Sequence, residues 1–256
     1  MTEVGDPGSA PGERTDAHEW SRRADLVAKL THEIRGPVST IRGLTGTTLT
    51  HYERLSDDER KEFLQLIRHE ADRLERAVEQ VALVLKLDAG SLRFDIRPHD
   101  LGSIVRDAAR DAETGDRPFE VDVAEDLEAP ADSTYIGSLV RQLIDNASTY
   151  SPPDAPIEVQ LRREGDDALI EVTDRGPGIP PDKREVVFER FADWRPPGYE
   201  DRPGTGLGLF ICRAIARAHG GDASIADGPA GGTMRVVRLP GEGEWRSLGD
   251  HAPDLR

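Results

Sequence analysis

The chain has 256 residues, of which 36% are hydrophobic and 32% charged, and its formal net charge is −16 at pH 7. A surface this acidic argues against nucleic-acid binding through phosphate neutralisation and against docking on anionic lipid. The single cysteine, Cys212, excludes an intrachain disulfide and fits a reducing compartment. Because no apolar run approaches 18 residues and residues 1–20 contain no apolar stretch, we expect neither a membrane-spanning segment nor a signal peptide in this chain.

Two folded parts are predicted between two disordered ends. Residues 1–18 and the tail 241–256 are poor in apolar residues and rich in Gly, Pro and charged residues, which favours disorder. Between them, residues 19–90 have helical periodicity, whereas residues 91–240 mix strand and helix patterns. We therefore predict an α+β chain in which a helical hairpin is followed by an α/β sandwich.

The helical part is predicted to be an antiparallel hairpin. Apolar residues on its first helix recur three, four or seven apart, at Leu26, Leu30, Ile34, Ile41 and Leu44. Ser56 and Glu59 form a capping-box pair that is predicted to start a second helix. On that helix the apolar positions follow the coiled-coil period, at Phe63, Ile67, Ala71, Leu74, Val78, Val81 and Leu85. Two hairpins together would bury this stripe in a four-helix bundle, so we predict a homodimer; the alternative is a hairpin that packs on the rest of its own chain.

After a helix break at Asp88 to Gly90, strands and helices are predicted in mixed order. The predicted strands are 91–96, 119–123, 157–163 and 168–174, followed by a hairpin of 223–227 and 233–240. Asp100 and Asp132 are predicted to cap helices that run to residues 111 and 148. A short helix is predicted within 184–191 and a longer one from Gly204 to about residue 219.

Three glycine or aromatic patches follow one another in this second part, at residues 174–179, 188–191 and 204–209. Glycines before a helix let backbone N–H groups approach phosphate. The absence of a GK[ST] sequence excludes a Walker A loop, and the glycine spacing does not fit a Rossmann fingerprint. Asp174, at the end of a strand, could accept a hydrogen bond from the amine of adenine, and Asn146 could offer an oxygen to Mg²⁺. A structural turn and an ordinary surface Asn remain the alternatives.

The order of these patches resembles the Bergerat-type ATP-binding domain of the GHKL superfamily, which histidine kinases share with gyrase. Residues 142–151 resemble its N box, 174–179 its G1 box, 188–191 its F box and 204–209 its G2 box. The resemblance implies ATP and Mg²⁺ as cofactors, with Asn146 holding the metal, Tyr150 near the adenine or ribose, and Asp174 accepting from the adenine amine. The other nucleotide-binding residues that it implies are Gln142, Gly176, Gly178, Gly204, Thr205, Gly206, Leu207 and Gly208. Residues 192–203 would form a lid, with Arg195 and Arg202 as candidate γ-phosphate contacts.

Two positions depart from the N-box pattern. Gln142 stands where the family usually has Asn, and Thr149 stands where it usually has Lys. Gln keeps the amide on a longer arm, whereas Thr lacks a cation that would face phosphate. Both changes predict weaker ATP binding or slower turnover.

Residues 30–38, Leu-Thr-His-Glu-Ile-Arg-Gly-Pro-Val, resemble the H box of histidine kinases. The resemblance implies that His32 is the phosphoacceptor, and Glu33 could accept the proton of its imidazole during attack. A second His-Glu pair at His69 has no following Pro and is predicted to be structural. Gly36 replaces the Thr or Asn that is usual four residues after the histidine, which predicts weak phosphatase activity toward a phosphorylated partner.

Together these resemblances imply the core of a cytoplasmic sensor histidine kinase, either a soluble kinase or the cytoplasmic part of a membrane-associated system. It would autophosphorylate His32 and pass the phosphate to an aspartate of a response regulator. The alternative is a degenerate, nucleotide-responsive dimer that binds a partner. A third hypothesis, another GHKL ATPase or an anti-sigma-type serine kinase, is disfavoured by the hairpin and the H box.

Overall fold

The structure is a computed structural model that describes residues 31, 33–112, 117–202, 204–228, 231–241, 243 and 245. The chain divides into two compact units, residues 1–78 and residues 79–256. The predicted disordered segment 1–18 lies outside the described residues, as does nearly all of the tail 241–256. His32 also lies outside them.

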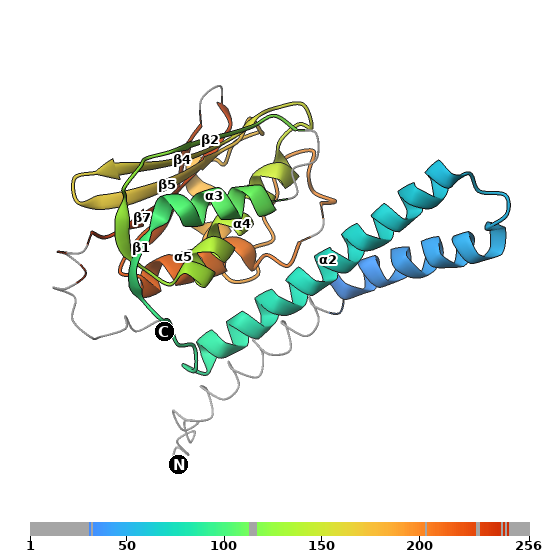
Figure 1. The fold of residues 1–256 in the computed structure, drawn as a ribbon, viewed down its shortest axis with the longest axis horizontal. Helices are drawn as coiled ribbons and strands as arrows, with labels where there is room; N and C mark the ends of the chain where they lie inside the picture. The colour runs from blue at the N-terminus through green and yellow to red at the C-terminus, as the bar shows by residue number, and fades with distance from the viewer. Residues whose placement is uncertain are drawn as a thin grey trace, which may run out of the picture. The chain divides into compact units, whose positions relative to one another are not determined.

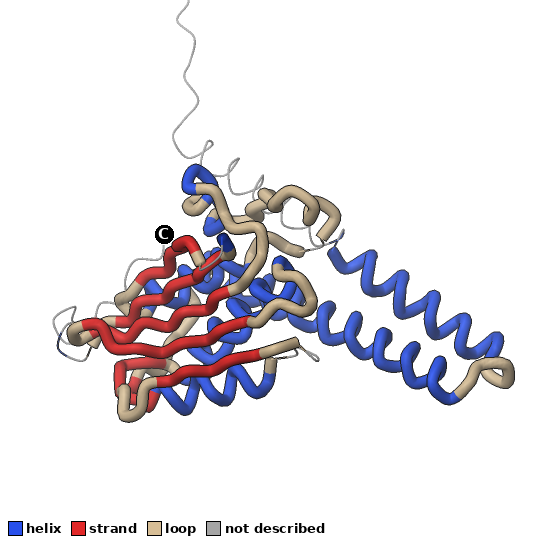
Figure 2. Tube along the Cα trace, turned by 90° about the horizontal axis from the view of Figure 1, so that it is seen from above, coloured by secondary structure: helices blue, strands red, loops and turns tan. Residues whose placement is uncertain are grey.

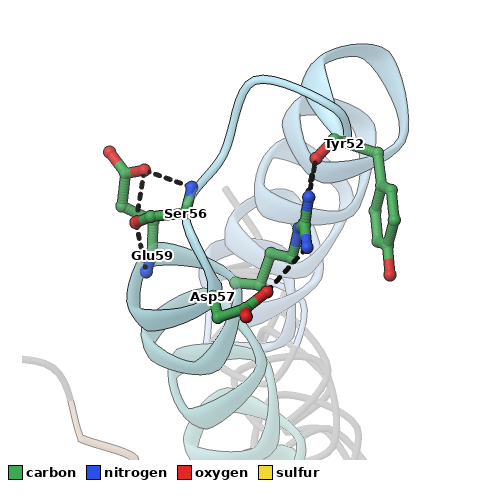
Figure 3. Close-up of polar contacts among 5 residues, drawn as sticks. Tyr52, Ser56, Asp57 and Glu59 are labelled. Carbon is green, nitrogen blue, oxygen red and sulfur yellow. Dashed lines mark hydrogen bonds and ion pairs between the residues drawn. The ribbon is translucent and has the colours of Figure 1, made fainter.

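The first unit contains a helical hairpin, as predicted (Figure 1). Its first helix is described over residues 33–51 and stays helical through Pro37, and α2 (Asp57–Asp88) follows and continues into the second unit. Figure 3 shows the predicted capping box in the turn between them: Ser56 N and Oγ both donate to Oε2 of Glu59, and Glu59 N donates back to Ser56 Oγ at 3.3 Å. The reciprocal bonds satisfy amide groups at the start of α2 that would otherwise lack an intrahelical partner.

An ion pair joins the two helices of the hairpin. Arg73 on α2 donates from Nη2 to Glu33 Oε2 at 3.3 Å, and its Nη1 lies 3.5 Å from Glu70 Oε2. Along α2, apolar side chains are exposed at steps of seven residues: Leu64, Ala71, Val78 and Leu85. Residues seven apart occupy the same heptad position, so these side chains line one side of the helix.

The second unit is built on a five-stranded sheet of order β2-β4-β5-β7-β6 (Figure 2). The strands are β2 (Phe119–Val123), β4 (Ile157–Glu164), β5 (Asp167–Thr173), β6 (Asp222–Asp227) and β7 (Thr233–Leu239). β2 and β4 pair in parallel, and the other neighbours pair antiparallel. A separate antiparallel pair, β1 (Arg97–Asp100) and β3 (Glu128–Ala131), aligns Arg97 with Ala131. The mixed sheet and its helices confirm the predicted α/β sandwich.

Three helices cover one face of the sheet: α3 (Leu101–Asp111), α4 (Ser133–Tyr150) and α5 (Gly208–Ala218) (Figures 1 and 2). The predicted caps are confirmed, because Asp100 accepts from two backbone amides at the start of α3 and Asp132 does so at the start of α4. Apolar side chains of the three helices pack with those of the strands in one core, and the last turns of α2 add the fully buried Val84 to it. Burial of these side chains is the main stabilising term for the unit.

Three predicted elements differ from the structure, and neither β1 nor β3 was predicted. Residues 91–96 are not a strand: Phe94 packs edge-on against the rings of Tyr135 and His219, and Asp95 N donates to the Asp132 carboxylate, so this backbone is not free to pair. The helix predicted within 184–191 is only a single 3₁₀ turn, η2 (Val186–Phe188), because the backbone becomes extended at Glu189, whose ψ is 152°; another 3₁₀ turn, η1 (Pro181–Lys183), precedes it. Similarly, Gly206 has a φ of 68°, so α5 begins only at Gly208.

Candidate functional site

Asp174, directly after β5, is held by four polar contacts at the edge of the sheet. Its side chain is 1% exposed. Oδ1 accepts from the amides of Gly176 at 2.6 Å and Thr233 at 3.2 Å, and Oδ2 accepts from Arg235 Nη1 at 2.6 Å. Its own amide donates to Thr233 O at 2.9 Å. A carboxylate fixed in this way is an acceptor of defined direction at the end of a strand.

Two glycines of the loop after Asp174 lie so close to neighbouring backbone atoms that no side chain would fit at either position. A Cβ on Gly176 would lie 2.3 Å from Tyr150 O, at the end of α4. A Cβ on Gly178, whose φ is 76°, would lie 2.8 Å from Gly231 O in the turn between β6 and β7. Both predicted G1 glycines are therefore required by the packing of this loop.

Asn146, on α4, is brought to the same cluster. Its Oδ1 accepts from Nε of Arg235 at 2.7 Å, while Nη1 of that guanidinium binds Asp174. Arginine has no acceptor atom, so the amide must turn its oxygen toward it. The structure thus brings together the residue predicted to read the base and the residue predicted to hold the metal, and it links them through a third residue.

Tyr150 is the last residue of α4 and lies at the edge of this cluster. Its ring centroid is 5.8 Å from that of Tyr199, in the predicted lid. Burial raises the pKa of the Tyr150 hydroxyl, while the positive charges of Arg195, Arg235 and Arg202 oppose that rise. Two of these three arginines, Arg195 and Arg202, belong to the predicted lid, so the lid lies close enough to Tyr150 to act on its hydroxyl.

The two arginines predicted to contact the γ-phosphate have partners within the lid. Nη1 of Arg195 donates to the carbonyls of Ala192 and Trp194, and its Nη2 donates to Gly204 O at 3.1 Å. The Arg202 guanidinium lies 5.8 Å from the ring centroid of Tyr199. In this conformation Arg195 therefore ties the lid backbone to the start of the G2 segment.

The G2 residues form the tight entry to α5. A Cβ on Gly206 would lie 2.4 Å from Ala192 O, and one on Gly208 would lie 2.8 Å from the side chain of Gln142. Leu207 is fully buried and precedes the helix without a side-chain cap on its first amides. Uncapped amides at a helix start can receive an anion.

Gln142, the unusual N-box residue, makes a hydrogen bond with a side chain of α2. Its Oε1 accepts from Nε2 of Gln80, and Oε1 of Gln80 accepts from the Thr205 hydroxyl at 2.7 Å. Thr205 Oγ1 also accepts from Leu207 N at 3.1 Å. One glutamine of α2 thus connects the N box with the G2 segment. Two turns further along, Asp88 at the end of α2 pairs through both carboxylate oxygens with Arg190 of the F box.

The second N-box departure has a local explanation. The hydroxyl of Thr149 donates to Asp145 O at 2.8 Å, one helical turn back. Threonine hydroxyls often bond in this way inside helices. Thr149 therefore contributes neither a charge nor a free donor to the cluster at Asn146.

Gln80 and Arg235 were missed in the sequence. Arg235 had a signal: β7 buries alternate residues, and an arginine in the buried register of a strand requires a partner. Gln80 had none, because a glutamine on a helix is ordinary and its two partners lie 62 and 125 residues away. Glu33 lies on the first helix of the hairpin unit, where Arg73 binds it.

The fold and the site define a class of protein, an ATP-binding α/β domain that follows a helical hairpin. Residues 131–243 match the family model of the histidine kinase-, DNA gyrase B- and HSP90-like ATPase. Residues 22–90 match the model of the His Kinase A (phospho-acceptor) domain. The two ranges together span most of the chain, which belongs to the sensor histidine kinase family. Where the two domains divide remains a prediction.

Curated relatives agree with this assignment. A probable sensor histidine kinase, TcrY of Mycobacterium tuberculosis, is 32% identical over 261 residues, which cover 96% of this chain and 54% of the relative. The sensor protein ChvG of Agrobacterium fabrum is also 32% identical, over 222 residues that cover 82% of this chain and 36% of the relative. The chain thus spans about half or less of these relatives.

Solved structures share the fold. A complex of the histidine kinase ThkA with the response regulator protein TrrA aligns with a TM-score of 0.59 and 23% identity over 93% of this chain and 69% of that one. The histidine kinase AdeS of Acinetobacter baumannii aligns with a TM-score of 0.58 and 19% identity, over 82% of this chain and 98% of that one. Among the residues described here, no helix combines the length and the apolar character needed to cross a membrane.

Proposed function

We propose that this chain is a histidine kinase core that binds ATP with Mg²⁺ and phosphorylates its own His32. The observation that carries the proposal is the fixed, buried carboxylate of Asp174. The loop that follows it requires glycine at positions 176 and 178, and Arg235 links the carboxylate to Asn146 on α4. An ionised carboxylate accepts hydrogen bonds and cannot donate them. It therefore selects a base that presents an amine, as adenine does, over one that presents a carbonyl oxygen.

The described residues fit a metal that arrives with the nucleotide. They contain no group of three or more His, Cys, Asp or Glu side chains that could hold a metal ion. Mg²⁺ characteristically keeps several waters and binds one or two protein oxygens together with substrate phosphates. Asn146 Oδ1 would be such an oxygen, and the bound ion would neutralise charge on the phosphates during transfer.

The hairpin supplies the acceptor chemistry. A neutral imidazole nitrogen of His32 would attack the γ-phosphorus, so that an N–P bond forms while the P–O bond to ADP breaks and ADP leaves with the electron pair. The proton on the other ring nitrogen would pass to the carboxylate of Glu33. Arg73 holds that carboxylate at 3.3 Å, which makes it a directed acceptor instead of a freely rotating one.

We also propose that the kinase is a homodimer built on a four-helix bundle. Leu64 and Val78, two members of the exposed stripe on α2, are 61% and 52% exposed in the single chain. A second hairpin packed on the stripe would remove this apolar surface from water, at about 25 cal/mol per Å². Introducing a charge at both positions should therefore yield monomers in sedimentation. Leu49 is the matched control, because it is exposed on the first helix outside the stripe, and a charge there should leave the dimer intact.

The phosphate would pass from His32 to an aspartate of a response regulator. A fold like that of ThkA, which was solved with the response regulator TrrA, supports this partner. Gly36 provides no side chain that could orient a water molecule to hydrolyse the phosphorylated regulator, so we expect weak phosphatase activity. Rapid loss of phosphate from a phosphorylated cognate regulator mixed with this chain would contradict that expectation.

Incubation with γ-labelled ATP and Mg²⁺ tests the proposal. We expect an acid-labile, base-stable label that disappears in His32→Gln and Asn146→Ala. His69→Gln is the matched control, because His69 is also a histidine followed by glutamate but is exposed on α2, and it should keep the label. Nucleotide binding without any label would favour the alternative, a degenerate partner-binding dimer, which the changes at Gln142 and Thr149 motivate.

A further inference from the structure

Arg235 is the one buried arginine among the residues that the structure describes. It is 2% exposed and lies on β7, where the neighbouring buried positions are Thr233, Val237 and Leu239. Placing a guanidinium in such a register is costly unless the charge is paired and its N–H groups are bonded. An aliphatic residue would meet the packing need alone, so the arginine is expected to have another role.

The pairing of Arg235 is divided between two elements. Nη1 donates to Asp174 Oδ2 at 2.6 Å, after β5, and Nε donates to Asn146 Oδ1 at 2.7 Å, on α4. Because the guanidinium is planar and rigid, two bonds from different nitrogens fix the two acceptors relative to each other. Lysine, with a single nitrogen on a flexible stem, cannot reproduce this geometry.

The bond to Asn146 has a consequence for the metal. Oδ1 is the only atom by which the Asn146 side chain would coordinate Mg²⁺, and it already accepts from a cation. A divalent ion that shares this oxygen would lie within a few ångströms of the guanidinium and repel it. Metal and Arg235 therefore compete for one oxygen, while Asp174 keeps Arg235 in place when Asn146 is released.

We propose that Arg235 is a positioning residue that couples the base-reading and metal-binding ends of the nucleotide site: it orients Asp174 and restrains Asn146 until the metal-bound nucleotide takes over the Asn146 oxygen. The proposal depends on the proposed ATP site. It predicts that magnesium strengthens nucleotide binding less than it would with a free Asn146, because part of the metal's contribution is spent on breaking the bond from Nε.

Calorimetric binding of a non-hydrolysable ATP analogue, with Mg²⁺ and with EDTA, tests the coupling. Arg235→Lys keeps a positive charge beside Asp174 and releases Asn146, so the ratio of the Kd in EDTA to the Kd in Mg²⁺ should rise about 2- to 10-fold, the equivalent of one hydrogen bond. Arg238→Lys is the matched control, because Arg238 lies on the same strand and pairs with Asp167 outside the cluster, and its ratio should equal that of the wild type. Combining Arg235→Lys with Asn146→Ala should abolish the difference.

A second measurement requires no substitution. The Nε–H resonance of Arg235 should be protected from solvent exchange in the free protein and with the analogue in EDTA, and should lose that protection when Mg²⁺ is added. Protection that Mg²⁺ leaves unchanged, or a ratio that is the same in wild type and Arg235→Lys, would overturn the role of Arg235. Wild-type protein that binds the analogue under neither condition would instead overturn the proposed function.

Discussion

The side chain of Gln80 offers the most direct test of how the end of α2 supports the proposed nucleotide site. It makes two hydrogen bonds, one to Gln142 and one from Thr205, and all three side chains are half-buried. In Gln80→Ala both bonds are lost, while the freed groups can reach water. The net loss should be about 0.5–1.5 kcal/mol per bond, or about 1–3 kcal/mol in total. Alanine is a strong helix former, so α2 itself should persist.

The loss should be local. Val84 remains in the core and Asp88 remains paired with Arg190, so the end of α2 should stay attached. Local unfolding of residues 204–209 should become more frequent. The Thr205 hydroxyl that donates to Gln80 also accepts from Leu207 N, so losing Gln80 should weaken the protection of that amide. If the free energy of local opening falls by about 1–3 kcal/mol, amide exchange should become roughly 5- to 150-fold faster, since RT is about 0.59 kcal/mol.

Hydrogen–deuterium exchange followed at residues 204–209 is the assay. Gln65→Ala is the matched control, because Gln65 lies on α2 and is exposed, and its substitution should leave the exchange of this segment unchanged. Exchange at Leu207 that is equal in Gln80→Ala, Gln65→Ala and wild type would refute the reasoning. Acceleration over the whole second unit would also refute it, since it would mean that Gln80 supports the fold and not the G2 segment.

Three further outcomes follow from buried groups. Burial lowers the pKa of His219, whose Nε2 accepts from Asp132 N, so the free energy of unfolding should fall as the pH drops below about 6.5; urea titrations should show a weaker pH dependence in His219→Gln. Gly176→Ala should destabilise the fold by about 1–3 kcal/mol and weaken ATP binding, whereas Gly137→Ala, whose Cβ meets nothing closer than 3.7 Å, should do neither in the same titrations. Burial raises the pKa of the Cys212 thiol, so native protein should react with a thiol reagent only as fast as it unfolds, and rapid labelling would contradict its burial.

Local chemistry explains which parts of the fold could be predicted. The caps at Asp100 and Asp132 and the capping box at Ser56 depend on residues two or three apart, and all three are confirmed. Alternation of apolar residues likewise identified β4 and β5, and a hairpin pattern identified β6 and β7. β3 has the sequence Glu-Ala-Pro-Ala, which has no strand pattern, and it pairs with β1 only because the tertiary fold brings the two together.

The candidate site was predictable as a set of motifs, but not as a network. The glycines of the G1 and G2 segments pointed to close backbone approach, and the packing at Gly176 and Gly206 requires it. The contacts that organise the site come from residues outside the motifs, Gln80 on α2 and Arg235 on β7. Their partners are distant in sequence, so only the folded structure reveals them.

The departures at Gln142 and Thr149 acquire a different meaning in this network. The side-chain amide of Gln142 accepts from Gln80, so this residue connects the N box to α2. Although Thr149 supplies no cation, Arg195 and Arg202 of the predicted lid act on the neighbouring Tyr150, so positive charge is present near the N box without a lysine at position 149. Because a phosphate responds to the summed field and not to one lysine, the loss of that lysine does not by itself predict an inactive kinase. An active enzyme with an altered dependence on magnesium is the outcome that these contacts favour.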